Sequence, residues 1–395
     1  MTEFLQHAMI TAGSATLLLT IPGVLELLLV TSSVFRSRSL PNKCTDNGFR
    51  LVAVVPAHNE EALVGACVTS ILSSAKTGPC CEVVVVADNC TDGTAARARE
   101  AGAWVLVRED SQRRGKGYAL RFAFGHLMEE EFNGFLIVDA DSVVSASFVQ
   151  EIARILFAGA DAVQARYRVA NPSDSLRKRL MEVALLAFNV VRPRGRDRWG
   201  ISAGISGNGF ALARQTLLDV PYSAESIVED LEYHLLLINQ GKKVRFADRA
   251  TVYGVMPDDA DAQSSQRARW EGGRLRVARD WLPKLAGQIL RGKFAAAEPM
   301  LELLTLPLAY LATVSLFLCA LPYGFFRWYG AAVLAILLTH VVSAIALGDE
   351  CLKNLMSLIA APFYVAWKVT TLLAVFRSSS RKTEWIRTQR RTGTS

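Results

Sequence analysis

Long apolar segments at both ends of the chain, separated by a charge-rich middle, constrain the fold most strongly. Residues 8–34 are almost entirely apolar or small, and Glu26 is the only charged residue among them. A helix needs about 20 such residues to cross a hydrocarbon core of about 30 Å, so we expect an N-terminal transmembrane helix here. A cleaved signal peptide is the competing interpretation, but the chain start carries Glu3 in place of a basic region, and the apolar run is too long.

Composition and charge place the rest of the chain relative to this helix. Hydrophobic residues make up 51% of the chain, and the mean hydropathy of +0.23 is high for a wholly soluble protein. Basic residues follow the apolar run at positions 36, 38, 43 and 50. Because such residues favour the cytoplasmic side, we expect the next domain to be cytoplasmic and the helix to lie in the inner or plasma membrane. The net charge of +7 predicts contact with anionic membrane lipids. Without a basic helix or an aromatic-basic stripe, nucleic acid is not an expected partner.

The C-terminal part repeats the apolar pattern. Residues 299–321 and 328–347 are each long enough to cross a bilayer. Before them, the amphipathic stretch 282–298 is expected to lie along the cytoplasmic membrane surface, although such a stretch also suits a helix packed on a soluble domain. We therefore expect a multi-pass membrane protein.

A last apolar segment, 355–376, is harder to place. It contains Lys368 and precedes a basic tail at 377–395. A further full crossing would put that tail outside, against the usual distribution of basic residues. We therefore expect 299–376 to combine transmembrane helices with a re-entrant or interfacial segment, and the tail to be cytoplasmic.

Between these regions, residues 49–281 alternate short apolar strands with helical stretches, which is typical of an α/β domain with a parallel sheet. The expected strands are 51–55, 83–87, 104–107 and 135–138, and the expected helices are 60–74, 94–101 and 118–130. This pattern predicts a doubly wound, nucleotide-binding architecture. No G-x-G-x-x-G or Walker loop is present, which argues against an ordinary dinucleotide or ATP fold.

Acidic residues follow the expected strands, where ligands gather in such sheets. Asp88 follows the second strand, and Asp139 and Asp141 follow the fourth. Two carboxylates one residue apart offer hard oxygen ligands that suit Mg²⁺ or Mn²⁺ bridging a diphosphate. A similar Asp-x-Asp pair also opens the site of haloacid-dehalogenase phosphatases, in which the first Asp is a nucleophile. The motif alone leaves both interpretations open.

Two later motifs separate these interpretations. Asp230 lies in Val-Glu-Asp at the start of an expected helix, and Gln266-Arg-Ala-Arg269-Trp270 follows. Together with Asp88 and the Asp-x-Asp pair, their order resembles the D, DxD, D, QxxRW signature of membrane-bound family 2 inverting glycosyltransferases, similar to cellulose, hyaluronan and poly-N-acetylglucosamine synthases. The resemblance covers residues 50–281 and implies a GT-A fold, that is, a Rossmann-like nucleotide-diphospho-sugar transferase domain.

The resemblance implies a role for each matching residue. Asp230 would be the general base, and Asp139 and Asp141 would bind the metal. The donor nucleotide would be bound by Pro56, Ala57, Glu60, Asp88, Lys116, Asp139, Gln266 and Arg269. The acceptor would be bound by Gly207, Asn208 and Trp270. The base motif begins with Val228 where the family commonly has Thr, which leaves the acceptor open.

The implied function is metal-dependent transfer of a hexose from a UDP-sugar to a lipid-linked or growing polysaccharide acceptor. Single addition to a glycolipid is the main alternative, because three or four apolar segments are few for a polysaccharide conduit. A membrane-anchored phosphatase and a non-catalytic nucleotide-sensing protein are further alternatives. A homo-oligomer, or a place in a polysaccharide export complex, is compatible with the same family.

Overall fold

The computed structural model describes residues 2–36, 48–76, 78–224, 228–255 and 260–370, with the backbone alone for residue 2 and for 260–269 and 369–370. The α/β domain contains the strands β1 (Leu51–Ala57), β2 (Cys81–Asp88), β3 (Trp104–Arg108), β4 (Gly134–Ile137), β5 (Ser142–Val144), β6 (Ala162–Val169), β7 (Phe210–Ala213) and β8 (Val244–Gly254). Its helices are α2 (Val64–Ala75), α3 (Thr94–Glu100), α4 (Lys116–Leu127), α5 (Phe148–Phe157), α6 (Leu176–Leu186), α7 (Arg192–Arg198), α8 (Arg214–Asp219) and α9 (Glu229–Asn239).

The eight strands form one mixed sheet in the order β3-β2-β1-β4-β7-β6-β8-β5. The first half matches the predicted parallel arrangement, because β1 pairs in parallel with β2 and β4, and β2 pairs in parallel with β3. The second half is mixed. There β6 pairs in parallel with β8, as predicted. The prediction of a parallel sheet is wrong for β7, which runs antiparallel to both β4 and β6, and for β5, which runs antiparallel to β8.

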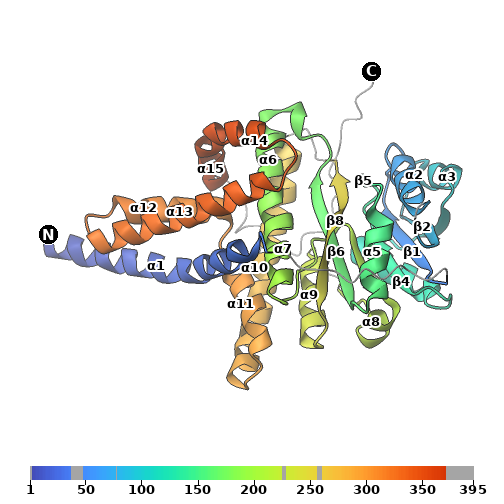
Figure 1. Ribbon diagram of the computed structural model, residues 1–395, viewed down its shortest axis with the longest axis horizontal. Helices are drawn as coiled ribbons and strands as arrows, with labels where there is room; N and C mark the ends of the chain where they lie inside the picture. Colours follow the sequence, from blue (N-terminus) through green and yellow to red (C-terminus); the bar gives the residue numbers. More distant parts are fainter. Residues whose placement is uncertain (1, 37–47, 77, 225–227, 256–259, 371–395) are drawn as a thin grey trace.

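Both faces of the sheet are covered, and the strands are correspondingly apolar on both sides. One core packs the sheet against α4 and α9 and includes Leu120, Phe135 and Tyr233. The other packs it against α2 and α5 and includes Ile71 and Ile152. In Figure 1 the helices α2, α3 and α5 lie around the strands at one end of the molecule, away from the long apolar helices.

The remaining elements are α1 (Thr2–Ser33), α10 (Ala260–Leu290), α11 (Ala297–Leu304), α12 (Leu308–Ala320), α13 (Gly324–Ala346), α14 (Cys351–Ser357) and α15 (Ala361–Thr370), with short 3-10 turns at 172–174, 294–296 and 358–360 and a π-helical turn at 187–191. Figure 1 shows α1, α12 and α13 side by side, extending away from the α/β domain. Among the described residues, 3–33 and 324–346 are long and apolar enough to cross a membrane.

The C-terminal region departs from the expected helices. The segment 299–321 is divided between α11 and α12, which are bent by 76°, because Pro307 starts a new helix and disfavours helical geometry in the residue before it. The predicted helix at 282–298 is the end of the longer α10 followed by a break. The described part of 355–376 forms short helices only, and the tail at 377–395 lies outside the described residues.

The end of α1 packs closely against α7. A Cβ added to Gly195 would lie 2.7 Å from the Cα of Val30, so only glycine permits this approach. Ser33 Oγ donates a hydrogen bond of 2.9 Å to the Gly195 carbonyl, and Trp199 Nε1 donates one of 2.8 Å to the Leu29 carbonyl. The apolar helix is therefore attached directly to the α/β domain.

A buried cluster of charges joins the same parts of the chain. Arg196 of α7 bonds to Glu26 of α1 through Nη2. Its Nε lies 2.6 Å from Glu298 Oε1 and its Nη1 lies 3.1 Å from Glu302 Oε2, both on α11. Arg192 Nη1 lies 3.7 Å from the second oxygen of Glu26. Isolated buried charges are unfavourable, so these residues stabilise one another, and Glu26, the only charge in the apolar run 8–34, has structural partners.

Candidate active site

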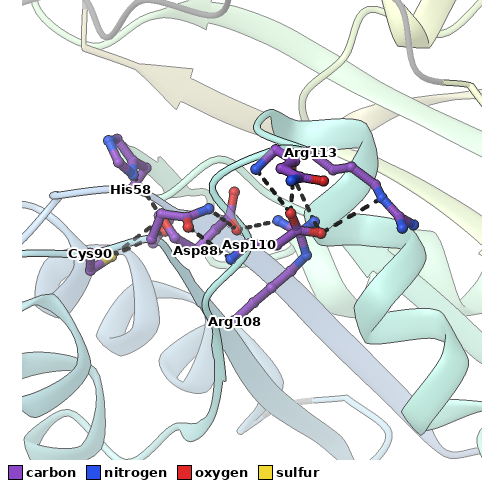
Figure 2. A network of polar contacts seen from close by, with 9 residues as sticks. His58, Asp88, Cys90, Arg108, Asp110 and Arg113 are labelled. Atoms are coloured by element: carbon purple, nitrogen blue, oxygen red, sulfur yellow. Dashed lines mark hydrogen bonds and ion pairs between the residues drawn. The ribbon is translucent and has the colours of Figure 1, made fainter.

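Asp88, at the end of β2, belongs to a polar network that closes the loops after β1 and β2 (Figure 2). Its Oδ1 accepts hydrogen bonds from Arg108 Nη1 at 2.6 Å and from Asn89 Nδ2 at 2.9 Å. Its carbonyl is 2.7 Å from His58 Nδ1. Burial raises the pKa of the Asp88 carboxyl, and the guanidinium of Arg108 opposes that shift. The network thus fixes an acidic side chain at the edge of the sheet.

Arg108 extends this network to the loop before α4. Its Nη2 donates to Asp110 Oδ2 at 3.0 Å and to the Arg113 carbonyl at 2.7 Å. The Asp110 amide in turn donates to Asn89 Oδ1 at 2.9 Å. In Figure 2 Arg108 lies between Asp88 and the loop that carries Asp110 and Arg113. Arg108 therefore joins two of the loops that lead to the site.

The loop after β1 is interlocked with the loop after β2. Pro56 and Ala57 are the last residues of β1, and Asn59 follows with a positive φ of 55°. Asn59 Oδ1 accepts a bond of 2.7 Å from the Thr91 amide, and the Glu60 amide donates one of 2.8 Å to Thr94 Oγ1. The predicted nucleotide residues of the first two strands therefore lie in one connected pair of loops.

Lys116, the first residue of α4, brings three distant parts of the chain together. Its Nζ lies 2.5 Å from Asp139 Oδ1 and donates to the Gly207 carbonyl. Glu229 Oε1 is 4.0 Å away. Burial lowers the pKa of Lys116, but the carboxylates, Asp139 first, outweigh it and raise the pKa above its usual value. Lys116 is therefore a cation held among acidic groups.

Asn208 connects the Gly-rich segment to the Asp-x-Asp loop. The Asp139 amide donates to Asn208 Oδ1 at 3.1 Å, and Asn208 Nδ2 donates to Ser142 Oγ at 2.9 Å. Ser142 Oγ donates in turn to Asp141 Oδ1 at 3.0 Å. The side chain of Asn208 is buried, and its observed bonds hold the loop of Asp139 and Asp141. Contact of Asn208 with an acceptor stays a prediction.

Asp230 lies in the first turn of α9 and faces the Gly-rich segment. Gly207 has a φ of +75°, and a Cβ added there would lie 3.0 Å from Asp230 Oδ2. The Leu231 amide donates to Asp230 Oδ1 at 2.8 Å. Burial raises the pKa of Glu229 to about 8 and also raises that of Asp230, while Lys116 opposes both shifts. A carboxylate with a raised pKa is a stronger base.

The Gln-to-Trp motif lies in α10, where the side chains of Gln266 and Arg269 are outside the described residues. Trp270 is 44% exposed. Three residues later, a Cβ added to Gly273 would lie 2.9 Å from Val228 Cγ1. The end of the motif therefore approaches the turn that carries Asp230.

The structure thus brings Lys116, Asp139, Gly207 and Asp230 into one cluster, with Asn208 and Asp141 beside it. Sequence analysis missed Arg108 and Ser142 as parts of the site. A signal for Arg108 existed, because it is the last residue of β3 and strand ends mark the binding edge. Ser142 directly follows the Asp-x-Asp pair but carries no separate pattern.

The acidic cluster suits a metal only in part. Within the described ranges, no group of three or more His, Cys, Asp or Glu residues could enclose an ion. Asp139 and Asp141 still offer carboxylate oxygens on one short loop. Mg²⁺ is commonly bound by one or two carboxylates, with phosphate oxygens and water completing its coordination. The residues therefore fit a metal that arrives with a diphosphate.

The mixed Rossmann-like sheet, with acidic loops at the ends of its parallel strands, defines a GT-A-like fold. A family model described as "Glycosyltransferase like family 2" matches residues 49–273, which is more than half of the chain. The chain therefore belongs to this family. Membership of this family argues against the haloacid-dehalogenase phosphatase interpretation.

Relatives of the chain agree with this assignment. It is 26% identical to the probable glycosyltransferase YdaM of Bacillus subtilis over 59% of this chain and 57% of that protein. It is also 26% identical to the uncharacterized glycosyltransferase YaiP of Escherichia coli over 63% of this chain and 60% of that protein. The matches therefore span less than two thirds of either relative.

A solved structure extends the comparison beyond the α/β domain. The mannosyltransferase PcManGT of Pyrobaculum calidifontis, in complex with GDP-Man and Mn²⁺, matches 94% of this chain and 100% of its own with a TM-score of 0.54. The two chains are 19% identical, so the likeness concerns the fold.

Proposed function

We propose that this protein is a membrane-bound, metal-dependent, inverting hexosyltransferase. It would transfer a hexose from a UDP-sugar to a lipid-linked or growing polysaccharide acceptor at the cytoplasmic membrane face. The observation that carries the proposal is the convergence of Lys116, Asp139, Gly207 and Asp230 from separate elements. Two helices long enough to cross a bilayer support the membrane location.

The cluster divides into a donor side and an acceptor side. Asp139 and Asp141 would hold Mg²⁺ or Mn²⁺, and the bound ion would neutralise the charge of the leaving nucleotide diphosphate. Lys116, already 2.5 Å from Asp139, adds a cation beside the same diphosphate. Arg269 and Gln266 would close this side, in keeping with the preference of guanidinium groups for phosphate oxygens.

Asp230 would act on the acceptor. Inverting transfer requires a base that removes the acceptor proton as the new bond forms opposite the leaving group. Burial raises the pKa of Asp230, which strengthens it as a base, and its contact with Gly207 places it beside the Gly-rich segment. The exposed indole of Trp270 offers an apolar face for a sugar ring.

The substitution Asp230→Asn tests the base assignment. We expect donor binding to persist while the transfer rate falls by several orders of magnitude, because the amide accepts no proton. Donor affinity is measured by titration with the nucleotide, and transfer by release of UDP in the presence of acceptor lipids. An unchanged rate would contradict the assignment.

Chelation and a donor panel test the remaining parts. EDTA should abolish transfer, and added Mg²⁺ or Mn²⁺ should restore it; full turnover in EDTA would exclude the metal role. Supplying UDP-sugars and GDP-mannose in parallel identifies the donor. Growth of the product beyond one added sugar distinguishes polysaccharide synthesis from single addition to a glycolipid.

A further inference from the structure

The turn of α10 that directly follows Trp270 is bonded to two C-terminal helices. The hydroxyl of Tyr310, on α12, donates to Glu271 Oε2 at 2.9 Å. Lys368 Nζ, on α15, lies 2.9 Å from Glu271 Oε1. The side chains of Glu271 and Lys368 are 15% and 12% exposed. Because each carboxylate oxygen contacts a different helix, the orientation of Glu271 is fixed.

The same two helices contact each other at this point. Lys368 Nζ lies 5.1 Å from the centroid of the Tyr310 ring, a distance suited to a cation–π interaction. Lys368 is the charged residue within the apolar segment 355–376. Its position against Glu271 accounts for a cation in that segment, because a charge of low exposure requires a partner.

Arg274, one turn further along α10, attaches the helix on another side. It donates to the carbonyl of Glu302 and, at 3.2 Å, to that of Thr305. These carbonyls lie at the break between α11 and α12, where the Glu302 carbonyl also accepts a hydrogen bond of 3.2 Å from the Thr305 amide. Arg274 therefore fixes α10 to the bend itself.

Gly273, in the turn of α10 between Glu271 and Arg274, lies against the start of α9, which carries Asp230. The 2.9 Å separation between an added Cβ and Val228 Cγ1 means that the backbone of α10 approaches the residue before Glu229 and Asp230. A shift of this turn would therefore move Trp270 and press on the start of α9. The junction at 271–274 thus connects the C-terminal helices to both sides of the acceptor site.

We propose that Glu271 is a positioning residue for the acceptor side of the site. Through Tyr310 and Lys368 it fixes the turn between Trp270 and Gly273, so that the C-terminal helices determine the placement of Trp270 and Asp230. This inference rests on the proposed function, because it assigns Trp270 and Asp230 to the acceptor.

The variants Glu271→Gln and Lys368→Met break the ion pair from either side. We expect each to lower kcat/KM for the acceptor by about 10- to 100-fold, as a small misplacement of reacting groups does. The KM for the donor should stay unchanged. Because a misplaced acceptor leaves the donor open to water, the ratio of UDP released to sugar transferred should rise. The charge reversal Glu271→Lys with Lys368→Glu should restore most of the transfer.

Lys353→Met is the matched control. Lys353 also belongs to the C-terminal region and pairs with Glu350 at 2.5 Å, but Lys353 is on α14, Glu350 directly precedes that helix, and neither contacts α10 in this pair. It should leave both kcat/KM and the ratio unchanged.

The outcomes separate the two proposals. Absence of transfer by the wild-type protein from every nucleotide sugar would overturn the proposed function and this inference with it. Wild-type transfer combined with an unchanged ratio in both single variants would overturn only the positioning role. The positioning role would also be overturned if the single variants impaired the kinetics for donor and acceptor equally and the charge reversal failed to restore transfer. That pattern indicates a general loss of folding.

Discussion

At the scale of single residues, Asn208 shows how a neutral amide supports the acidic loop. Its side-chain oxygen accepts a hydrogen bond from the Asp139 amide, and its side-chain nitrogen donates one to the Ser142 hydroxyl. The Ser142 hydroxyl in turn donates to Asp141. Groups that orient metal ligands in this way commonly change metal affinity by about 10- to 100-fold when they are removed.

Asn208→Ala should therefore weaken activation by metal. We expect the Mn²⁺ concentration for half-maximal transfer to rise by about 10- to 100-fold, because the loop of Asp139 and Asp141 loses its support. Metal titration of the transfer rate measures this. Asn239→Ala removes an exposed amide at the other end of α9, whose Oδ1 accepts a bond of 2.8 Å from Gln288 Nε2, and it should leave the titration unchanged. Equal curves for both variants would contradict the role of Asn208.

The acidic pair at the start of α9 predicts the pH dependence. Asp230 must be ionised to act as a base, and burial raises its pKa, so kcat/KM should rise with pH through a limb above the ordinary value of 3.8. Burial raises the pKa of Glu229 to about 8, so this carboxyl is still protonated and neutral over the same limb. Glu229→Gln should therefore leave the limb in place. Rate profiles of the two proteins test this, and a limb displaced in the variant would contradict it.

The same shift affects stability with a definite sign. Glu229 has a pKa of about 8 when folded and an ordinary value of 4.5. The folded protein therefore retains a proton that the unfolded chain releases, and the contribution of Glu229 becomes less favourable as pH rises between these values. Glu229→Gln should reduce this loss of stability on the alkaline side.

Strand-end acidic residues could be predicted from the sequence, whereas their partners could not. Asp88 and Asp139 follow short apolar strands that have a clear pattern. The bond between Lys116 and Asp139, and the approach of Gly207 to Asp230, depend on how distant elements pack. Local sequence periodicity carries no information about such contacts between distant elements.

At the scale of elements, the crossing of α1 and α7 depends on Gly195. Gly195→Ala would force its Cβ against the backbone of Val30, which cannot move without displacing α1. We expect a loss of about 1–3 kcal/mol, as in other overpacked sites. Thermal unfolding in detergent measures the change.

Gly287→Ala provides the opposite case. Gly287 lies within α10, and nothing is within 4 Å of an added Cβ. Alanine should therefore stabilise the helix by about 1 kcal/mol because of its higher helix propensity. Equal effects of the two substitutions would show that the close contact at Gly195 contributes nothing.

Elements of the first half of the sheet were predictable because strand and helix alternate regularly there. The second half was not, since β7 and β5 are short and reverse the direction of pairing. The division of 299–321 had a local signal in Pro307. The prediction of one continuous segment used only length and hydropathy, and neither takes account of a proline.

At the scale of the whole molecule, the charge cluster at Arg196 unites the apolar helices with the α/β domain. It joins α1, α7 and α11 through Glu26, Glu298 and Glu302. The sequence reveals Glu26 as a lone charge in an apolar run, but its partners lie far along the chain. Domain boundaries drawn from hydropathy therefore separate residues that stabilise each other.

Glu26→Gln should destabilise the entire protein. Removing one partner leaves buried arginine charge uncompensated, which commonly costs about 3–5 kcal/mol. Glu3→Gln, near the exposed start of the same helix, should have no effect. Unfolding in denaturant, with the α/β domain and the helices monitored separately, would show a shared loss. Retention of the wild-type midpoint by Glu26→Gln would contradict this coupling.

With the membrane location proposed above, the 76° bend between α11 and α12 would have a consequence for the surrounding lipid. Beyond the bend, α12 contains 13 residues, which at 1.5 Å per residue extend about 20 Å. A bilayer of ordinary thickness, about 30 Å across its hydrocarbon core, would be too thick for it. Acyl chains beside α12 would be compressed, and this local thinning would bring the two headgroup layers closer together at the side of the protein that α12 occupies.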